Sequence, residues 1–376
     1  MKQTSPNKEF NEKALKHLIG KDALKRLSNA LISVYPAFDQ VYWNNLINSL
    51  ESLELKPRVH LLRDELRKLL PENYASALNI LLLSLRKGNI RGFDIWPYTE
   101  YIQKYGLENL TVSLDALKIF TTLFTSEWAV RPFIKQYRNE TLRYLEVCAK
   151  DNDVNIRRWA SEGTRPRLPW GERLHDFIRD PSLTLPILEL LKFDDELYVR
   201  KSVANHLNDI AKDHPEFVVK TLSRWQDEAG QTNAAKVNWI IHRSLRTLIK
   251  NGNAKALKLI GVSNQAKIEF LKFKIHEKMI KLGERVNFEF TIRSTSKKPQ
   301  KIVVDYIVHF VKANKQITTK VFKLKTLVLG PDETIIFTKN HHFKKITTRE
   351  YYSGQHAIEI QINGNVQGKQ EWLLAL

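Results

Sequence analysis

The sequence predicts a mostly α-helical chain, built as a solenoid of stacked helix pairs, that ends in a small all-β sandwich. Three observations support this fold class. From residue 14 to about residue 261, apolar residues recur at helical spacing. Helix pairs recur about every 30–45 residues, which is the period of HEAT-like arrays. After residue 265 the apolar spacing changes to period two. We therefore expect a HEAT-like repeat domain over residues 1–264 and a sandwich over residues 265–376.

The helical region divides into short amphipathic segments. Trp43, Leu46, Ile47 and Leu50, for example, share one helical face. Pro71 fits the first turn of a new helix, because a backbone N–H there would have no partner. The expected helices cover residues 15–19, 24–32, 41–53, 61–70, 74–85, 114–124, 129–136, 138–149, 155–163, 185–191, 198–211, 215–225, 234–249 and 254–259.

Residues 88–106 differ from the segments on either side. Gly88, Gly92, Trp96, Pro97 and Gly106 interrupt any long helix. We expect a loop here that is packed by its aromatic side chains.

Two short stretches are copies of one repeat signature. They are Asp-Val-Asn-Ile-Arg-Arg at 153–158 and Glu-Leu-Tyr-Val-Arg-Lys at 196–201. Each begins a helix with an acidic residue, which suits the helix dipole. Arrays of such repeats curve, and the second helix of each pair lines a concave groove.

The C-terminal region alternates apolar and polar residues. Val286, Phe288, Phe290 and Ile292 are the clearest example. About seven short strands separated by turn signals are typical of an immunoglobulin-like sandwich. The expected strands cover residues 270–275, 285–293, 302–311, 317–327, 333–338, 356–362 and 370–374.

The charge balance favours a polyanionic partner. The formal net charge is +19 and the isoelectric point is about 9.7. Nucleic acid is the first candidate and an anionic membrane the second. The alternative is a charge that serves only solubility.

The cysteine content and the N-terminus indicate a reducing compartment. The single cysteine, Cys148, excludes a disulfide or a thiolate metal site within one chain. Residues 1–10 contain no apolar core of a signal peptide, and no stretch has the apolar length that spans a bilayer. We expect a cytoplasmic monomer that binds no membrane.

Residues 155–171 hold the most candidate functional side chains. Arg158 and Glu162 lie four apart and so share a helical face. Gly163 ends that helix, and two prolines stiffen the residues after it. Arg165, Arg167 and Trp170 stand in this stiffened loop. A surface connection would not need two guanidinium groups and an indole held beside a carboxylate, so the segment is a candidate site.

Three segments together resemble one known family. The run Arg-Arg-Trp-Ala-Ser-Glu-Gly-Thr-Arg-Pro-Arg-Leu-Pro-Trp-Gly at 157–171 resembles the signature of AlkC-type alkylpurine DNA glycosylases, which are HEAT-like relatives of the AlkD type. Ser-Glu-Trp-Ala-Val-Arg-Pro-Phe at 126–133 and Tyr-Val-Arg-Lys-Ser-Val-Ala-Asn-His-Leu-Asn-Asp-Ile at 198–210 are similar to two further family segments. The resemblance covers roughly residues 20–260. AlkC-type proteins often carry a C-terminal immunoglobulin-like domain, in agreement with the strand pattern.

The resemblance implies an enzyme that acts on duplex DNA containing alkylated bases. It implies a monofunctional glycosylase that releases 3-methyladenine, and also 3-methylcytosine, and leaves an abasic site. Carried over, it places Glu162 and Trp170 at the lesion, with Glu127 and Asp209 nearby. Asp209 would stabilise positive charge on the sugar and position water, Glu162 would contact the lesion or its sugar, and Trp170 would stack on the cationic nucleotide.

Basic residues supply the expected contacts with the DNA backbone. Arg158 would orient the carboxylates or touch the backbone. The other expected phosphate contacts are Arg131, Arg165, Arg167 and Arg200 in the helical region and Lys297, Lys298, Lys344 and Lys345 in the sandwich. Lysines in a β-sandwich also protect sheet edges against aggregation, which is the alternative role for the last four.

No cofactor or metal is expected. The sequence has no His-Glu-x-x-His motif, no Cys/His cluster of ligand spacing and no glycine-rich phosphate loop.

The main alternative function is a non-catalytic DNA-binding or scaffold protein. HEAT-like arrays mostly serve interactions, so the fold alone favours that reading. Arg158 with Glu162 would then be an ordinary ion pair across one helical turn. The feature that favours an enzyme is the combined set Glu127, Glu162, Trp170 and Asp209, because a scaffold needs no such set.

Overall fold

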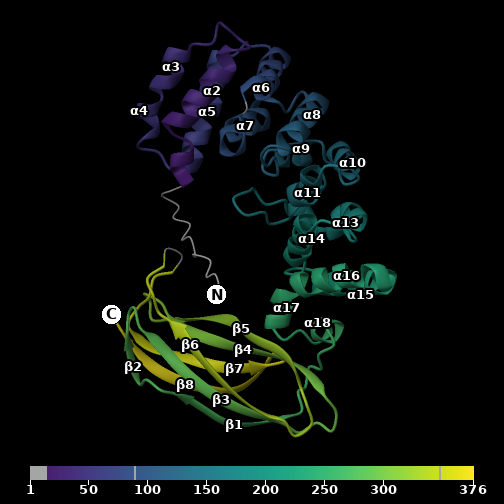
Figure 1. Ribbon diagram of the computed structural model, residues 1–376, viewed down its shortest axis with the longest axis vertical. Coiled ribbons are helices and arrows are strands. Elements are labelled where there is room, and N and C mark those ends of the chain that lie inside the picture. The colour runs from purple at the N-terminus through teal and green to yellow at the C-terminus, as the bar shows by residue number, and fades with distance from the viewer. Residues whose placement is uncertain (1–14, 89, 347–348) are drawn as a thin grey trace, which may run out of the picture. The chain divides into compact units, whose positions relative to one another are not determined.

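The chain forms a helical part followed by a β-sandwich (Figure 1). The computed structural model describes residues 15–88, 90–346 and 349–376. Two compact units divide between Ile210 and Ala211. The first unit is helical, and the second combines four helices with the sandwich. The predicted fold class is therefore confirmed, whereas the predicted domain boundary at residue 264 stays a prediction.

The first unit consists of helices joined by turns and loops. Their bounds are η1 (Lys16–Leu18), α2 (Lys21–Ile32), α3 (Gln40–Asn45), α4 (Ile47–Leu50), α5 (Leu55–Leu69), α6 (Tyr74–Gly88), η2 (Gly92–Ile95), α7 (Trp96–Tyr105), α8 (Leu110–Thr121), α9 (Arg131–Gln136), α10 (Arg138–Cys148), α11 (Val154–Gly163), α12 (His175–Arg179), η3 (Pro181–Thr184), α13 (Leu185–Leu191) and α14 (Leu197–Ile210).

Helix α11 shows how local sequence sets the boundaries of an element. The Asp153 carboxylate accepts hydrogen bonds from the N–H groups of Asn155 and Ile156 and so begins the helix. Gly163 ends it, and a Cβ there would lie 2.7 Å from the Val130 side chain. The buried face of α11 packs against α14, α10 and α13.

The expectation of a loop over residues 88–106 is wrong. The chain forms η2 and then α7, and Trp96, Tyr98 and Tyr101 are fully buried. Pro97 lies in the first turn of α7, where its missing N–H costs no hydrogen bond. The proline and the glycines therefore mark the ends of two short helices, and the aromatic side chains form core.

The two copies of the repeat signature share one structural role. Arg157 Nη1 donates to the carbonyls of Asp151 and Asn152, at 3.0 and 2.9 Å. Arg200 Nη1 donates to the carbonyls of Asp194 and Asp195, both at 2.7 Å. In each copy the arginine holds the turn that precedes its own helix.

The second unit begins with helices and ends with strands. Their bounds are α15 (Pro215–Glu228), α16 (Gly230–Ser244), α17 (Arg246–Lys250), α18 (Ala254–Leu259), β1 (Ile268–Ile275), β2 (Met279–Lys281), β3 (Arg285–Ser294), β4 (Gln300–Val311), β5 (Ile317–Leu329), β6 (Thr334–His342), β7 (Gly354–Ile362) and β8 (Asn365–Ala375). The short strand β2, which pairs parallel with β8, was not predicted.

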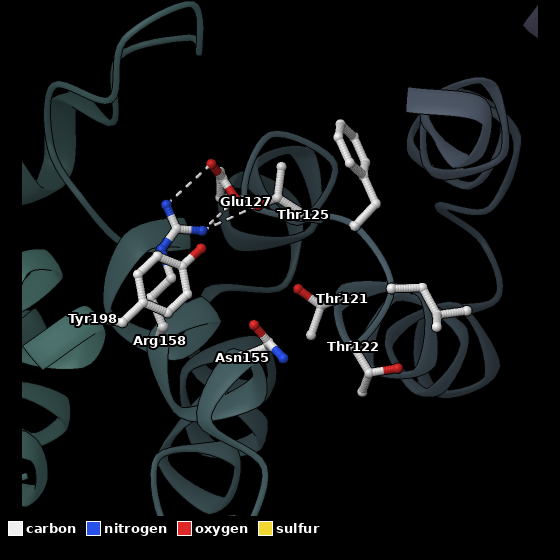
Figure 2. Close-up of a pocket in the computed structure, with 9 residues that line it drawn as sticks. Thr121, Thr122, Thr125, Glu127, Asn155, Arg158 and Tyr198 are labelled. Atoms are coloured by element: carbon white, nitrogen blue, oxygen red, sulfur yellow. Dashed lines mark hydrogen bonds and ion pairs between the residues drawn. The ribbon is translucent and has the colours of Figure 1, made fainter. Parts of the chain in front are cut away.

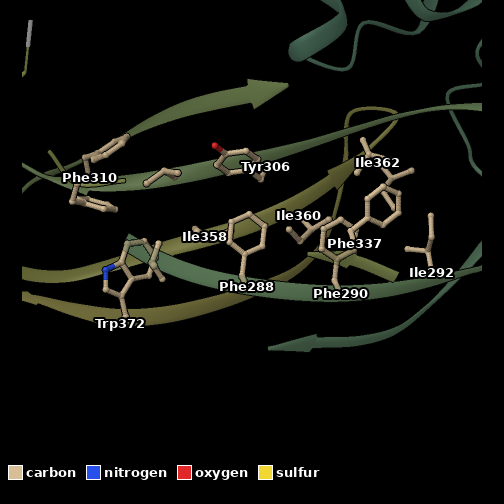
Figure 3. Close-up of a cluster of buried hydrophobic side chains, with 14 of the residues drawn as sticks. Phe288, Phe290, Ile292, Tyr306, Phe310, Phe337, Ile358, Ile360, Ile362 and Trp372 are labelled. Atoms are coloured by element: carbon tan, nitrogen blue, oxygen red, sulfur yellow. The ribbon is translucent and has the colours of Figure 1, made fainter. Parts of the chain in front are cut away.

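Two sheets form the sandwich, with strand orders β1-β3-β6 and β2-β8-β7-β4-β5. Period-two alternation directs every second side chain inward. Phe288 and Phe290 of β3 thus meet Ile358, Ile360 and other inward side chains of the five-stranded sheet (Figure 3). Because one face of each sheet packs into this shared core, apolar and polar residues alternate in the sequence.

The turn after α17 lies against the hairpin that joins β7 and β8. Gly252 and Gly364 both have positive φ, and a Cβ on Gly364 would lie 2.1 Å from Cα of Gly252. Gln361 also donates to the Lys250 carbonyl at 2.9 Å. Because only glycine permits this approach, these contacts fix the last helices on the sandwich.

Asp305 is buried where α17 meets the five-stranded sheet. It is 2% exposed, and its Oδ1 atom has no hydrogen-bond partner within the described part of the chain. Burial raises the pKa of Asp305 to about 6, although Lys250 and Lys323 oppose the shift. Because the folded-state pKa is raised, the stability that Asp305 contributes is fully present below its ordinary pKa and is lost as pH rises through about 6.

We expect Asp305→Asn to stabilise the protein near neutral pH. The two pKa values predict a gain in the free energy of unfolding of about 3 kcal/mol at pH 7.5 but only about 1 kcal/mol at pH 4.5. Urea unfolding of both proteins at the two pH values measures the difference. Asp332→Asn, at an exposed turn of the same sandwich, is the matched control. An equal effect of Asp305→Asn at both pH values would contradict the assignment.

No helix in residues 15–88, 90–346 and 349–376 combines the length and the apolar character that a membrane span requires.

Candidate functional site

Three carboxylates from distant parts of the first unit meet at one place. Glu127 lies in the connection between α8 and α9, Glu162 near the end of α11, and Asp209 near the end of α14. Helices α11 and α14 pack together, which brings the last two close. All three side chains are buried, with exposed fractions of 5%, 6% and 3%.

Arg158 joins the first two carboxylates. Its Nη1 atom donates to Glu127 Oε2 at 3.0 Å, and its Nη2 atom lies 3.5 Å from Glu162 Oε1. The guanidinium also lies 4.8 Å from the centre of the Tyr198 ring. Figure 2 shows Arg158 between Glu127 and Tyr198. Arg158 is therefore held over one face by Tyr198 and at its edge by the two carboxylates, whereas its predicted orienting role stays a prediction.

Arg165 joins the second and third carboxylates. Its Nη1 atom donates to Glu162 Oε1 at 2.6 Å, and its Nε atom donates to Asp209 Oδ2 at 2.9 Å. Ser202 donates to the other oxygen of Glu162 at 2.6 Å. Carboxylates and guanidinium groups thus alternate from Glu127 to Asp209 in what we call the acidic network, Glu127–Arg158–Glu162–Arg165–Asp209.

A neutral histidine contacts the backbone next to the acidic network. His206 is fully buried, and its Nδ1 atom hydrogen-bonds to the Ser161 carbonyl at 3.1 Å. Burial lowers the pKa of His206 to about 3, so that the ring stays neutral at physiological pH. The ring therefore positions the backbone beside Glu162 without adding positive charge.

The acidic network carries one more negative than positive charge when all its members are ionised. Burial raises the pKa of Glu127, although Arg158 opposes that shift. Burial acts to lower the pKa of Arg158, but Glu127 and Glu162 outweigh it and the net shift is upward. Buried charges are tolerated only when they are paired and hydrogen-bonded, and this network satisfies both conditions.

A cavity of about 330 Å³ opens beside Glu127. Figure 2 shows its wall, in which the hydroxyls of Thr121 and Thr125, the Asn155 amide and the Tyr198 ring accompany the Glu127–Arg158 pair. The network is thus reachable from one side by a polar group of moderate size.

Trp170 is the exposed member of the predicted set. It stands on the 164–174 loop between α11 and α12, and it is 55% exposed. Its φ of 62° lies in the left-handed region, which costs a residue other than glycine about 1–2 kcal/mol. Its ring is parallel to that of Trp96, at 1° and 6.4 Å between centroids, and it also stacks on Trp128. An indole is thus presented outward on a strained but well-supported backbone.

The predicted DNA-binding residues fall into two groups by location. Arg131 and Arg165 are buried, and Arg131 donates to the carbonyls of Gly163, Arg165 and Glu172. Arg167 and Arg200 are partly exposed, and Lys297, Lys298, Lys344 and Lys345 are exposed on the second unit. Phosphate binding by each of them stays a prediction, and the contacts of Arg131, Arg165 and Arg200 favour structural roles.

Several supporting residues were not predicted from the sequence. Tyr198 and Ser202 approach the acidic network from α14, and Lys56 and Trp96 approach Trp170 from α5 and α7. Tyr198 and Ser202 lie in the 198–210 segment that resembles the AlkC-type family, and this position could have indicated them. Nothing in the sequence around Lys56 indicated a contact 114 residues away.

Among the described residues, no group of three or more histidine, cysteine or acidic side chains has the geometry to hold a metal ion.

The fold and the site define a helical-repeat protein with an acidic network, an exposed tryptophan and a C-terminal β-sandwich. Residues 269–376 match the family described as "Uncharacterised protein YhaZ, C-terminal Ig-like domain". The whole chain is similar to the uncharacterized protein YhaZ of Bacillus subtilis (strain 168), with 37% identity over 94% of this chain and 97% of that protein.

A solved structure places the chain in a family. The alkylpurine DNA glycosylase AlkC of Pseudomonas fluorescens, bound to DNA containing an abasic site analog, matches with a TM-score of 0.90 and 37% identity. The match covers 96% of this chain and 99% of that one. The chain therefore belongs to the family of AlkC-type alkylpurine DNA glycosylases, and the resemblance seen in the sequence is confirmed.

Proposed function

We propose that this protein is a monofunctional DNA glycosylase that releases cationic N3-methylated bases from alkylated DNA. Its substrates are 3-methyladenine and 3-methylcytosine in duplex DNA, and its product is an abasic site. The observation that supports the proposal best is the acidic network, which gathers three carboxylates in a chain of the AlkC family.

Negative charge is the catalytic requirement of this reaction. Loss of the base leaves an oxocarbenium-like sugar, and a nearby carboxylate stabilises it more than it stabilises the neutral ground-state sugar. We assign this role, and the positioning of water, to Asp209. The C1′–N bond electrons leave with the base, water adds to C1′, and the proton of that water passes to the carboxylate or to solvent.

A cationic leaving group makes a strong general acid unnecessary. A purine or pyrimidine methylated at N3 already carries the positive charge that protonation would otherwise supply, and it leaves as a neutral base. Glu162 and Glu127 then add to the negative potential at the lesion. Arg158 orients both carboxylates through its contacts with Glu127 and Glu162.

We assign the recognition of the lesion to Trp170. The negative face of an indole attracts a cationic ring, and this attraction increases when water is excluded. Because the indole is exposed and its backbone is held, we assign Trp170 the stacking contact with the methylated nucleotide.

The basic surface provides affinity for the DNA backbone. Each phosphate neutralised by an arginine or lysine adds affinity that falls as salt rises. We propose Arg167 in the first unit and Lys297, Lys298, Lys344 and Lys345 in the second as phosphate contacts. The net charge of +19 agrees with such a partner.

The test is release of base from defined duplexes. Oligonucleotides with a single 3-methyladenine or 3-methylcytosine are incubated with the full chain, and the free base is measured by mass spectrometry. We expect release of both bases and strand cleavage only after alkali, because a monofunctional enzyme leaves the backbone intact. A duplex with a neutral ethenoadenine is the control and should stay uncut.

A non-catalytic scaffold is the outcome that would replace this proposal. It predicts binding to methylated and unmethylated duplexes with no base released from either. Cleavage of the strand without alkali would instead contradict the monofunctional assignment.

A further inference from the structure

We propose that Arg131, Trp128 and Lys56 are positioning residues whose common task is to hold Trp170 outward at the site. This inference rests on the proposed glycosylase function. Each of the three side chains donates to carbonyl groups at the end of α11 or in the 164–174 loop, so together they fix the backbone on both sides of Trp170.

Arg131 fixes the two ends of the loop. Its Nη1 atom donates at 2.9 Å to the carbonyls of Gly163 and Arg165, where the loop leaves α11. Its Nε atom donates at 2.7 Å to the Glu172 carbonyl, two residues after Trp170. One guanidinium thus joins the start of the loop to its return, across nine residues of chain.

The burial of Arg131 indicates that its hydrogen bonds to the loop carbonyls are its main role. The side chain is 1% exposed, and burial lowers its pKa to about 10, so the group stays protonated at physiological pH. A buried cation whose donors face backbone carbonyls has little capacity left for a phosphate oxygen. We therefore replace the predicted phosphate contact of Arg131 with a positioning role.

Trp128 and Lys56 fix the tip of the loop. Trp128 Nε1 donates to the Pro169 carbonyl at 3.0 Å, and its ring stacks on Trp170 at 6.2 Å between centroids. Lys56 Nζ, from α5, donates to the carbonyl of Trp170 itself at 3.0 Å. The residues immediately before and at the strained position are thus both held from outside the loop.

The conformation of Trp170 explains why so many contacts are needed. A φ of 62° is unfavourable for a tryptophan, so a free loop would relax away from it. The next residue, Gly171, packs so closely that a Cβ would lie 3.2 Å from the Trp128 ring and 3.3 Å from Arg131. The same two side chains therefore fix the loop by hydrogen bonds and by shape.

Lys56 is the best position for the test, because it is exposed and its replacement spares the core. The variants are Lys56→Met, Lys56→Arg as the conservative replacement, and Lys68→Met as a control that removes the same charge from an exposed site on α5. Trp128→Phe removes the bond to Pro169 and keeps an aromatic ring. All are made in the full chain, alone and together with Trp170→Ala.

Three measurements separate positioning from other roles: base release, affinity for undamaged duplex and the rate of trypsin cleavage. Single-turnover release of 3-methyladenine should fall about tenfold in Lys56→Met, since a displaced group forfeits its oriented contact. Affinity for undamaged duplex should match that of Lys68→Met, and Lys56→Arg should restore release. In the Trp170→Ala background, Lys56→Met should cause no further loss, because Lys56 acts only through Trp170.

The third measurement, trypsin cleavage, requires neither enzyme activity nor DNA. Trypsin cleaves after Arg167 but not before Pro166, so the fragment that begins at Leu168 reports on the order of the loop. We expect that fragment to appear faster from Lys56→Met and Trp128→Phe than from wild type or Lys68→Met.

The outcomes against the proposal are equally distinct. If Lys56→Met weakens binding to undamaged duplex and still lowers release in the Trp170→Ala background, Lys56 is a phosphate ligand and the inference fails. Unchanged trypsin cleavage in both variants also overturns it. If wild type releases no base, the proposed function fails, and the rate of cleavage still decides whether these residues hold the loop.

Discussion

Replacing Asp209 with asparagine is expected to slow release of 3-methyladenine by about two to three orders of magnitude, because removal of one preorganised electrostatic group costs about that much in other enzymes. Asparagine keeps the size of the side chain and an oxygen that can accept from Arg165, which now lies 2.9 Å from Asp209. The change therefore removes mainly the negative charge that would face the developing positive sugar.

The measurement is single-turnover base release at saturating enzyme, beside binding to a duplex with an abasic-site analogue. Asp22→Asn, an exposed acid in the first turn of α2, is the matched control and should behave as wild type. Glu162→Gln should also reduce release, but with a loss of stability, since Glu162 accepts from both Arg165 and Ser202. Normal release by Asp209→Asn with a large loss in Glu162→Gln would transfer the stabilising role to Glu162.

The arrangement of the acidic network could be predicted only in part. The three carboxylates stood in segments that resembled the family, and the convergence of inner helices made their proximity an expectation. Their partners could not be predicted in the same way, because an arginine in a basic protein has many possible anions. Arg131 and Arg165 were predicted to face phosphate, whereas the fold directs them to carbonyl and carboxylate groups inside the protein.

The elements of the fold were predictable where one period dominated. Strand β3 alternates without interruption, because one face meets the sandwich core and the other does not. Residues 88–106 were predicted wrongly because proline and glycine mark both loops and helix ends, and only the packing of Trp96, Tyr98 and Tyr101 distinguishes the two. The left-handed conformation of Trp170 gave no sequence signal at all, since it depends on contacts from α5 and from the segment that leads into α9.

Arg165→Met is expected to destabilise the protein by about 3–5 kcal/mol, the usual cost of removing one partner from a buried ion pair. The guanidinium lies between Glu162 and Asp209, at 2.6 and 2.9 Å, and both carboxylates are almost fully buried. Arg138→Met is the control, because Arg138 and its partner Asp176 are both about half exposed and such pairs contribute about 0–1 kcal/mol.

The cause of that loss can be separated from the loss of packing. If the uncompensated carboxylates are responsible, then Glu162→Gln and Asp209→Asn added to Arg165→Met should restore much of the free energy of unfolding in urea, because the neutral amides need no counter-charge. A triple variant as unstable as Arg165→Met would show instead that the arginine stabilises through the packing of its aliphatic stem. The remaining alternative is that Arg165 contacts a DNA phosphate, and the salt dependence of binding to undamaged DNA tests it. If Arg165 contacts a phosphate, Arg165→Met should reduce the slope of log affinity against log salt by about one. If Arg165 only bridges the two buried carboxylates, the slope should stay unchanged.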